Sequence, residues 1–119
     1  MAKFLISAAI ASCLVSQISI AEARSLYDGS WDLRFVTQQG TCDQSYDFTV
    51  NINDGIVTHP NLVRFKGYVA PSGAVRASVT VQDKYASGVG KLSANAGRGT
   101  WRGYSGTTRC SGYWTAQRS

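Results

Sequence analysis

Hydrophobic and polar residues alternate with a period of two over most of the chain beyond residue 24. Over residues 31–35, 46–52, 63–69 and 75–81, every second residue is apolar or glycine. Because successive side chains of a strand point to opposite faces, each segment predicts a strand with one buried face. No helical period is present in this region, so an all-β fold is predicted.

Turn-forming residues separate these segments. Ala70-Pro71-Ser72-Gly73 places Pro at the second position of a turn, where its fixed φ fits, and predicts a hairpin. Asp54-Gly55 supplies the positive φ values of a type I′ turn and predicts a hairpin to a short strand at residues 56–58. Further strands are predicted at residues 85–92, 99–104 and 110–117.

About eight strands joined by short turns predict an antiparallel up-and-down meander. Closing the meander into a small barrel removes the unpaired edges that would otherwise aggregate. Residues 24–119 suffice for one domain with one modest core, so we predict a single small β-barrel domain over these residues. A β-sandwich is the alternative.

The start of the chain has the pattern of a secretory signal peptide over residues 1–23. An apolar run at residues 4–15 follows Lys3, and Ala21-Glu22-Ala23 supplies a cleavage site. We expect cleavage near Ala23 and a periplasmic or secreted protein. The run is shorter than the roughly 20 residues of a spanning helix, so the mature protein is not expected to span a membrane. Lipidation of Cys13, after Ile10-Ala11-Ser12, is the alternative.

Cys42 and Cys110 remain after cleavage, and an even number of cysteines in a small exported chain predicts a disulfide. The bond would close a loop of roughly 70 residues, which is worth about 4 kcal/mol in the chain-entropy model.

The net charge is +5, and its distribution is uneven. From Lys84 onward there are six basic residues and no acidic one, which predicts a surface that attracts an anionic partner. The candidate binding residues are Arg98, Arg102, Arg109 and Tyr104. Arg98, Arg102 and Tyr104 are expected on one face of a strand, with Trp101 pointing inward. Nucleic acid fits the same charge, but export makes it an unlikely physiological partner.

Three tryptophans each follow a glycine by two residues. They are Trp31, Trp101 and Trp114. Such residues either fill the barrel core or line a ligand cavity, and both interpretations stay open. Gly88 and Gly90 share one face of a predicted strand, where they would leave room for a bulky aromatic ring or for a ligand.

Gly29-Ser30-Trp31, at the entry to the first predicted strand, resembles the opening motif of the calycin group of small exported β-barrels. The group includes lipocalins, avidin-like proteins and small bacterial inhibitors of secreted metalloproteases. With the chain length and strand count, the resemblance implies a calycin-like barrel of the bacterial envelope. It supplies no functional residue for this chain. The inhibitors of the group insert an N-terminal arm into the protease.

Catalytic chemistry is not indicated. His59 is the only histidine and precedes Pro60 in a predicted connection, so we expect a solvated loop side chain. Asp28 and Asp32 could form a carboxylate pair, but glycoside hydrolysis also requires a carboxylic acid in an apolar pocket, and the sequence indicates none. We therefore predict no enzyme activity, no metal site and no cofactor.

Two hypotheses of function remain. The first is a non-catalytic extracytoplasmic binding module for a small ligand or an anionic glycan of the cell envelope. The alternative is a secreted or periplasmic protein-interaction module, such as a protease inhibitor. A small-ligand binder needs an internal cavity of roughly a few hundred Å³, whereas an inhibitor needs a filled barrel and a projecting segment.

Export generates a direct prediction. The protein purified from its native envelope fraction should begin at or near Arg24 and carry no lipid, because the cleavage site follows Ala23. Mass spectrometry of the intact chain measures both properties. A diacylated N-terminal Cys13 would contradict the prediction.

Overall fold

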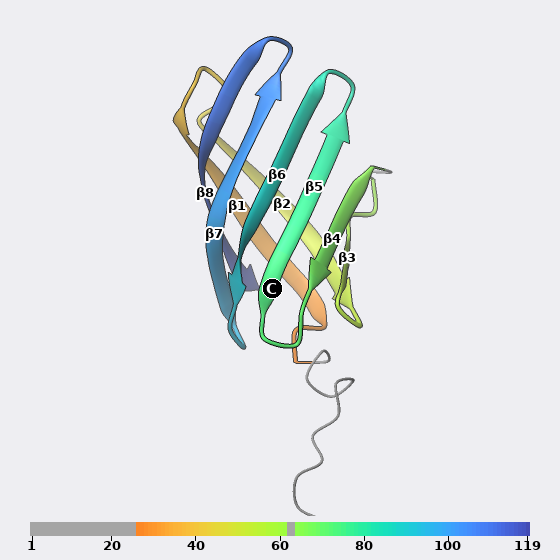
Figure 1. The fold of residues 1–119 in the computed structure, drawn as a ribbon. Coiled ribbons are helices and arrows are strands. Elements are labelled where there is room, and N and C mark those ends of the chain that lie inside the picture. The colour runs from red at the N-terminus through yellow and green to blue at the C-terminus, as the bar shows by residue number, and fades with distance from the viewer. Residues whose placement is uncertain (1–25, 62–63) are drawn as a thin grey trace, which may run out of the picture.

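The computed structural model describes residues 26–61 and 64–119 and shows a closed barrel of antiparallel strands (Figure 1). The strands are β1 (Gly29–Gln39), β2 (Ser45–Asn53), β3 (Ile56–Thr58), β4 (Phe65–Val69), β5 (Ala74–Val81), β6 (Lys84–Leu92), β7 (Ala96–Ser105) and β8 (Thr108–Arg118). Each strand pairs with the next, and β8 pairs with β1 to close the barrel. The predicted up-and-down barrel is therefore confirmed, and the β-sandwich alternative is wrong.

Three predictions fall outside the described residues: the signal peptide over residues 1–23, lipidation of Cys13 and a strand beginning at Val63. Elsewhere, β7 begins at Ala96 rather than at residue 99. The reason is a compact turn in which the backbone N–H and the Oγ of Ser93 both donate to the carbonyl of Ala96, at 2.7 and 3.0 Å. No described helix is long and apolar enough to cross a membrane.

The two hairpins predicted from turn residues are present. Asp54 and Gly55 have φ values of 53° and 81°, as a type I′ turn requires. Gly73 has a φ of 93°, and its N–H donates to the carbonyl of Ala70 at 2.8 Å. These turns set the register of β2 with β3 and of β4 with β5, and so decide which side chains enter the barrel.

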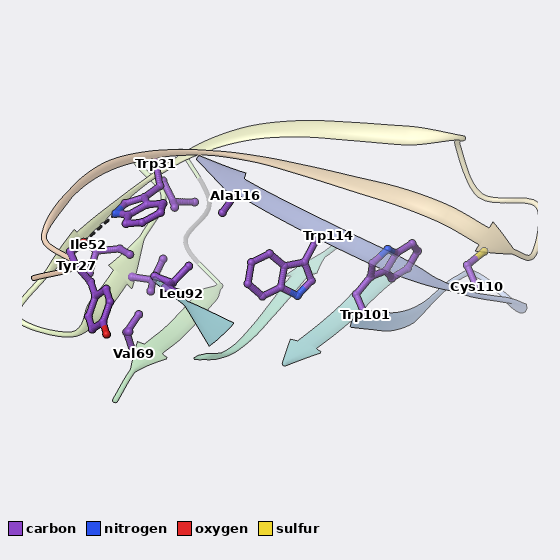
Figure 2. Close-up of a cluster of buried hydrophobic side chains, with 11 residues drawn as sticks. Tyr27, Trp31, Ile52, Val69, Leu92, Trp101, Cys110, Trp114 and Ala116 are labelled. Carbon is purple, nitrogen blue, oxygen red and sulfur yellow. Dashed lines mark hydrogen bonds between the residues drawn. The ribbon is translucent and has the colours of Figure 1, made fainter. Parts of the chain in front are cut away.

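One end of the barrel is packed around Trp31, and we call it the Trp31 end. Figure 2 shows Tyr27, Trp31, Val69 and Leu92 together there, while Trp101 and Cys110 lie toward the opposite end. Trp31 and Val69 are almost fully buried, at 1% and 0% exposure. Side chains from β1, β4 and β6 therefore pack together at this end.

Arg118 fastens the segment before β1 to the Trp31 end. Its guanidinium donates to the backbone carbonyls of Leu26, Asp28 and Ala94, at 2.5, 2.6 and 3.0 Å. The same group lies 4.6 Å from the centre of the Trp31 ring, a cation–π contact. One cation thus joins β1, β8, the β6–β7 turn and the chain preceding β1.

Trp114 fills the middle of the barrel, and the glycines of β6 and β7 make room for it (Figure 2). A Cβ at Gly99 would lie 2.6 Å from the Trp114 ring, and a Cβ at Gly90 would collide with the same ring. A Cβ at Gly88 would lie at 3.4 Å, close to ordinary contact. The glycines that sequence analysis assigned to an aromatic ring or a ligand therefore accommodate a ring.

The predicted disulfide is confirmed between Cys42, in the β1–β2 loop, and Cys110, in β8. It lies at the end of the barrel opposite Trp31, which we call the disulfide end (Figure 2). The bond joins positions 68 residues apart and ties the loop after β1 to the strand that closes the barrel.

The disulfide generates a stability prediction. Replacing Cys42 and Cys110 together by Ser should lower the free energy of unfolding by roughly 2–5 kcal/mol, because the unfolded chain loses a long-range constraint. Urea unfolding of the oxidised parent and of the variant measures this difference. An unchanged unfolding midpoint, or free thiols in the native protein, would contradict the prediction.

The close contacts at Gly90 and Gly99 lead to a second stability prediction. Gly90→Ala and Gly99→Ala should each destabilise the barrel by about 1–3 kcal/mol, because the new methyl group overlaps Trp114 and the neighbouring strand. Gly88→Ala is the control, because Gly88 lies in β6 with Gly90, and it should cost less than either. Thermal unfolding followed by tryptophan fluorescence compares the three. Equal losses of stability in the three variants would show that contact with Trp114 is not the reason for glycine at these positions.

Candidate functional site

The three tryptophans proposed from the sequence as ligand contacts lie inside the barrel. Trp31, Trp101 and Trp114 are 1%, 7% and 3% exposed. Their indole N–H groups donate to the backbone carbonyls of Tyr27, Val36 and Val89, at 2.8, 3.0 and 3.2 Å. The polar atom of each ring is therefore satisfied within the fold and does not face open space.

The barrel interior retains a cavity of about 50 Å³. Its walls are almost entirely apolar and include Trp31, Phe35, Phe65 and Trp114. Small-molecule sites typically have volumes of roughly 300–1,000 Å³ and a few polar groups that orient the ligand. The interior is thus too small, and too apolar, for a ligand of that kind in this conformation.

The cationic side chains proposed from the sequence lie on the outside of the barrel, on β7 and β8. Arg98 and Arg102 alternate along β7 with Trp101, which points inward. Tyr104 follows on the same outer face, and the β7–β8 register places Arg109 directly opposite Tyr104. The expected placement of Arg98, Arg102 and Tyr104 on the outer face of one strand, with Trp101 inside, is therefore present in the structure.

We call this surface the outer basic wall. It consists of the outward-facing bases and tyrosines of β6, β7 and β8: Tyr85, Lys91, Arg98, Arg102, Tyr104, Arg109 and Tyr113. In an eight-stranded barrel the surface turns by about 45° per strand, so the outer surface of these three adjacent strands curves through about 90°. No aspartate or glutamate occurs in these three strands.

The acidic residues of the neighbouring strands β1 and β2 are already engaged. Asp47 accepts two hydrogen bonds from Arg34, at 2.9 and 3.2 Å. That hydrogen bond raises the pKa of Arg34 above its ordinary value and holds the pKa of Asp47 below its ordinary value. Asp32 accepts from Thr49 and Ser119. Asp47 therefore neutralises Arg34 on its own side of the barrel, and Asp32 accepts from two hydroxyl groups there.

The guanidinium groups of the three arginines in the outer basic wall have no partner in the described part of the chain. Within residues 26–61 and 64–119, no hydrogen bond or ion pair joins the guanidinium group of Arg98, Arg102 or Arg109 to another group. All three side chains are exposed. Arg34 and Arg118, in contrast, are held by a carboxylate and by backbone carbonyls. The wall thus offers three free guanidinium groups to solvent.

Two open depressions meet on the wall at Arg102. One, of about 450 Å³, is lined by residues that include Gln39, Tyr85, Arg102, Tyr104, Arg109 and Ser111. The other, of about 720 Å³, extends toward Val89 and Thr100 and shares Gln39, Arg102 and Ser111 with the first. Tyr85 and Tyr104 are stacked at the edge of the first, with ring centres 5.7 Å apart.

Gln39 and Ser111 also border this surface, although no pattern in the sequence indicates them. Gln39 reaches Ser111 because β1 contains a bulge at Gln38, where the β1–β8 register shifts. Bulges have no clear pattern in a single sequence. The disulfide was the available indication, because Cys42 and Cys110 lie three residues and one residue away from this pair.

His59 differs from the solvated loop side chain expected from the sequence. It is half-buried, and its ring lies 6.0 Å from Phe48 and 6.5 Å from Phe65, measured between centres. Its Nδ1 accepts a hydrogen bond from the N–H of Asn61 at 3.1 Å. In the described part of the chain, no three His, Cys, Asp or Glu residues are grouped as a metal site would require.

The outer basic wall is thus defined by free cations, stacked tyrosines and depressions bordered by amide and hydroxyl groups. Comparison of this chain with protein-family models, with curated proteins and with solved structures found no match.

Proposed function

We propose that this protein is a non-catalytic, exported binding module that holds an anionic glycan of the cell envelope against the outer basic wall. The observation that carries the proposal is that Arg98, Arg102 and Arg109 lie on the outer face of β7 and β8, and that β6, β7 and β8 contain no aspartate or glutamate. Such a face attracts a polyanion and concentrates it locally.

The outside of the barrel supports this function better than the inside. The internal cavity of about 50 Å³ is well below the volume of ordinary ligand pockets. The wall, in contrast, combines charge with exposed tyrosines, which can stack against the apolar faces of sugar rings. An exported protein also meets glycans more readily than nucleic acids, so a glycan is the favoured polyanion.

A protein-interaction role, such as inhibition of a secreted protease, is the second candidate. The filled barrel supports it, because an inhibitor uses the barrel as a rigid base rather than as a container. The closed eight-stranded topology is compatible with the calycin-type relationship inferred from Gly29-Ser30-Trp31.

The proposed function predicts a salt-sensitive affinity. Binding to an acidic polysaccharide should weaken by about tenfold between roughly 50 and 200 mM salt, since screening shortens the reach of exposed charges. Replacing Arg98, Arg102 and Arg109 together by Gln should abolish binding and change the free energy of unfolding by less than about 1 kcal/mol. Isothermal titration calorimetry and urea unfolding measure the two effects.

A matched triple variant separates local charge from net charge. Replacing Arg64, Lys66 and Arg76 by Gln removes the same charge from the wall formed by β4 and β5, and it should leave most of the affinity intact. Equal losses of affinity in the two triple variants would show that binding depends only on the net charge of the protein. Binding of neutral dextran with the same affinity would also contradict the proposal.

A further inference from the structure

The depression bordered by Tyr104 has the features of a defined subsite, rather than of a diffusely charged surface. In an antiparallel sheet, directly opposed residues are close neighbours, and residues offset by two on the partner strand lie about 7–8 Å apart. Tyr104 is directly opposite Arg109, and Arg102 is the diagonal neighbour of Arg109. The two guanidinium groups therefore flank a single tyrosine on adjoining strands.

Nothing in the described protein neutralises this pair of cations. Arg102 and Arg109 line the same depression, and no described carboxylate lies within ion-pair distance of either. Like charges on neighbouring positions of a sheet repel each other modestly. An anion between them would relieve this repulsion and accept charge-assisted hydrogen bonds from both forks, as carboxylates commonly do.

Gln39 adds a neutral donor at the rim of the depression. The hydroxyl of Ser111 donates to Oε1 of Gln39 at 3.1 Å, which fixes the orientation of the amide. The amide nitrogen of Gln39 has no hydrogen-bond acceptor among the described residues. Two further N–H groups therefore lie beside the free guanidinium groups, and they suit an acceptor of more than one oxygen.

Tyr104 supplies the apolar surface that a simple ion site would lack. Its ring is 45% exposed although it is stacked on Tyr85, whose ring centre lies 5.7 Å away. The stack limits the motion of the Tyr104 ring and leaves part of it open to solvent. A ligand that carries its charge on a ring can cover this surface and reach the two arginines at once.

We propose that this depression is a subsite for one acidic sugar unit, whose ring lies against Tyr104 and whose carboxylate is held between Arg102 and Arg109. The proposal rests on the proposed function and adds the class of sugar that the outer basic wall selects. A polyanion without rings would engage the same arginines but leave Tyr104 in water. Recognition of the ring therefore distinguishes this subsite from a purely electrostatic surface.

The test compares three probes on the intact exported protein: oligogalacturonate, inorganic polyphosphate of similar charge, and neutral dextran. Oligogalacturonate should bind, and dextran should not. Tyr104→Ala should weaken oligogalacturonate binding by about three- to tenfold, the range expected for one lost aromatic contact. Arg109→Gln should weaken it by about tenfold, as for one lost charge-assisted hydrogen bond. Calorimetric titration at low salt provides the affinities.

Two control variants make the result specific. Tyr104→Phe keeps the ring and should retain the parent affinity within about twofold. Tyr68→Ala removes a tyrosine of similar exposure on β4, where the β4–β5 register also places an arginine, Arg76, opposite it. This variant should bind like the parent. Polyphosphate affinity should fall in Arg109→Gln but not in Tyr104→Ala.

The outcomes separate the subsite from the wider proposal. Equal affinity of the parent for oligogalacturonate and polyphosphate, with no effect of Tyr104→Ala on either, would overturn the subsite and leave anionic binding by the wall in place. Failure of the parent to bind either polyanion would overturn the proposed function itself. An equal loss in Tyr68→Ala and Tyr104→Ala would also overturn the subsite.

Discussion

Pairing of the last strand with the first is the constraint on which the rest of the structure depends. Once β8 lies beside β1, every strand has two neighbours and the inward and outward faces of the sheet are fixed. The pairing is not regular, because β1 carries an extra residue at Gln38. The bulge fits because the opposing residue is Gly112, where any side chain would collide with the carbonyl of Val36. Closure therefore relies on one glycine at the seam.

The same closure explains why tryptophans fill the interior. A barrel of eight strands encloses little more than the volume of its own side chains. Trp114 occupies the middle because Gly90 and Gly99 carry no side chain in its path, and Trp31 seals one end under Arg118. With each indole N–H bonded to a carbonyl, the large rings are fixed in orientation and not merely buried. The interior thus serves stability.

Much of this architecture follows from the sequence because its patterns are local. Alternation predicts strands, and Asp54-Gly55 and the Ala70–Gly73 tetrad predict turns that the backbone φ values confirm. Two cysteines leave one possible pairing. The fold was predictable because strand pairing between neighbours in sequence needs no long-range information.

The parts that could not be predicted depend on contacts between distant segments. The position of Gln39 beside Ser111 requires a bulge, and the burial of His59 among phenylalanines requires knowledge of where two strands approach each other. The group that occupies the space beside Gly88 and Gly90 was ambiguous for the same reason. A glycine in a strand indicates space, but only the register shows which side chain occupies it.

In the proposed function, the outer basic wall and not the filled interior contacts the partner, and the curvature of the wall restricts the shape of that partner. Side chains on strands two apart already point about 90° away from each other, so a flat partner contacts few of them. A linear polymer is less restricted, since it can follow β7 past Arg98, Thr100, Arg102 and Tyr104. These are successive outward positions of the strand and lie roughly 7 Å apart. Arg109 and Gln39 border the same path from one side, at the end of the wall fixed by the disulfide. The bond that stabilises the fold therefore also holds the loop after β1 next to the surface that the free arginines occupy.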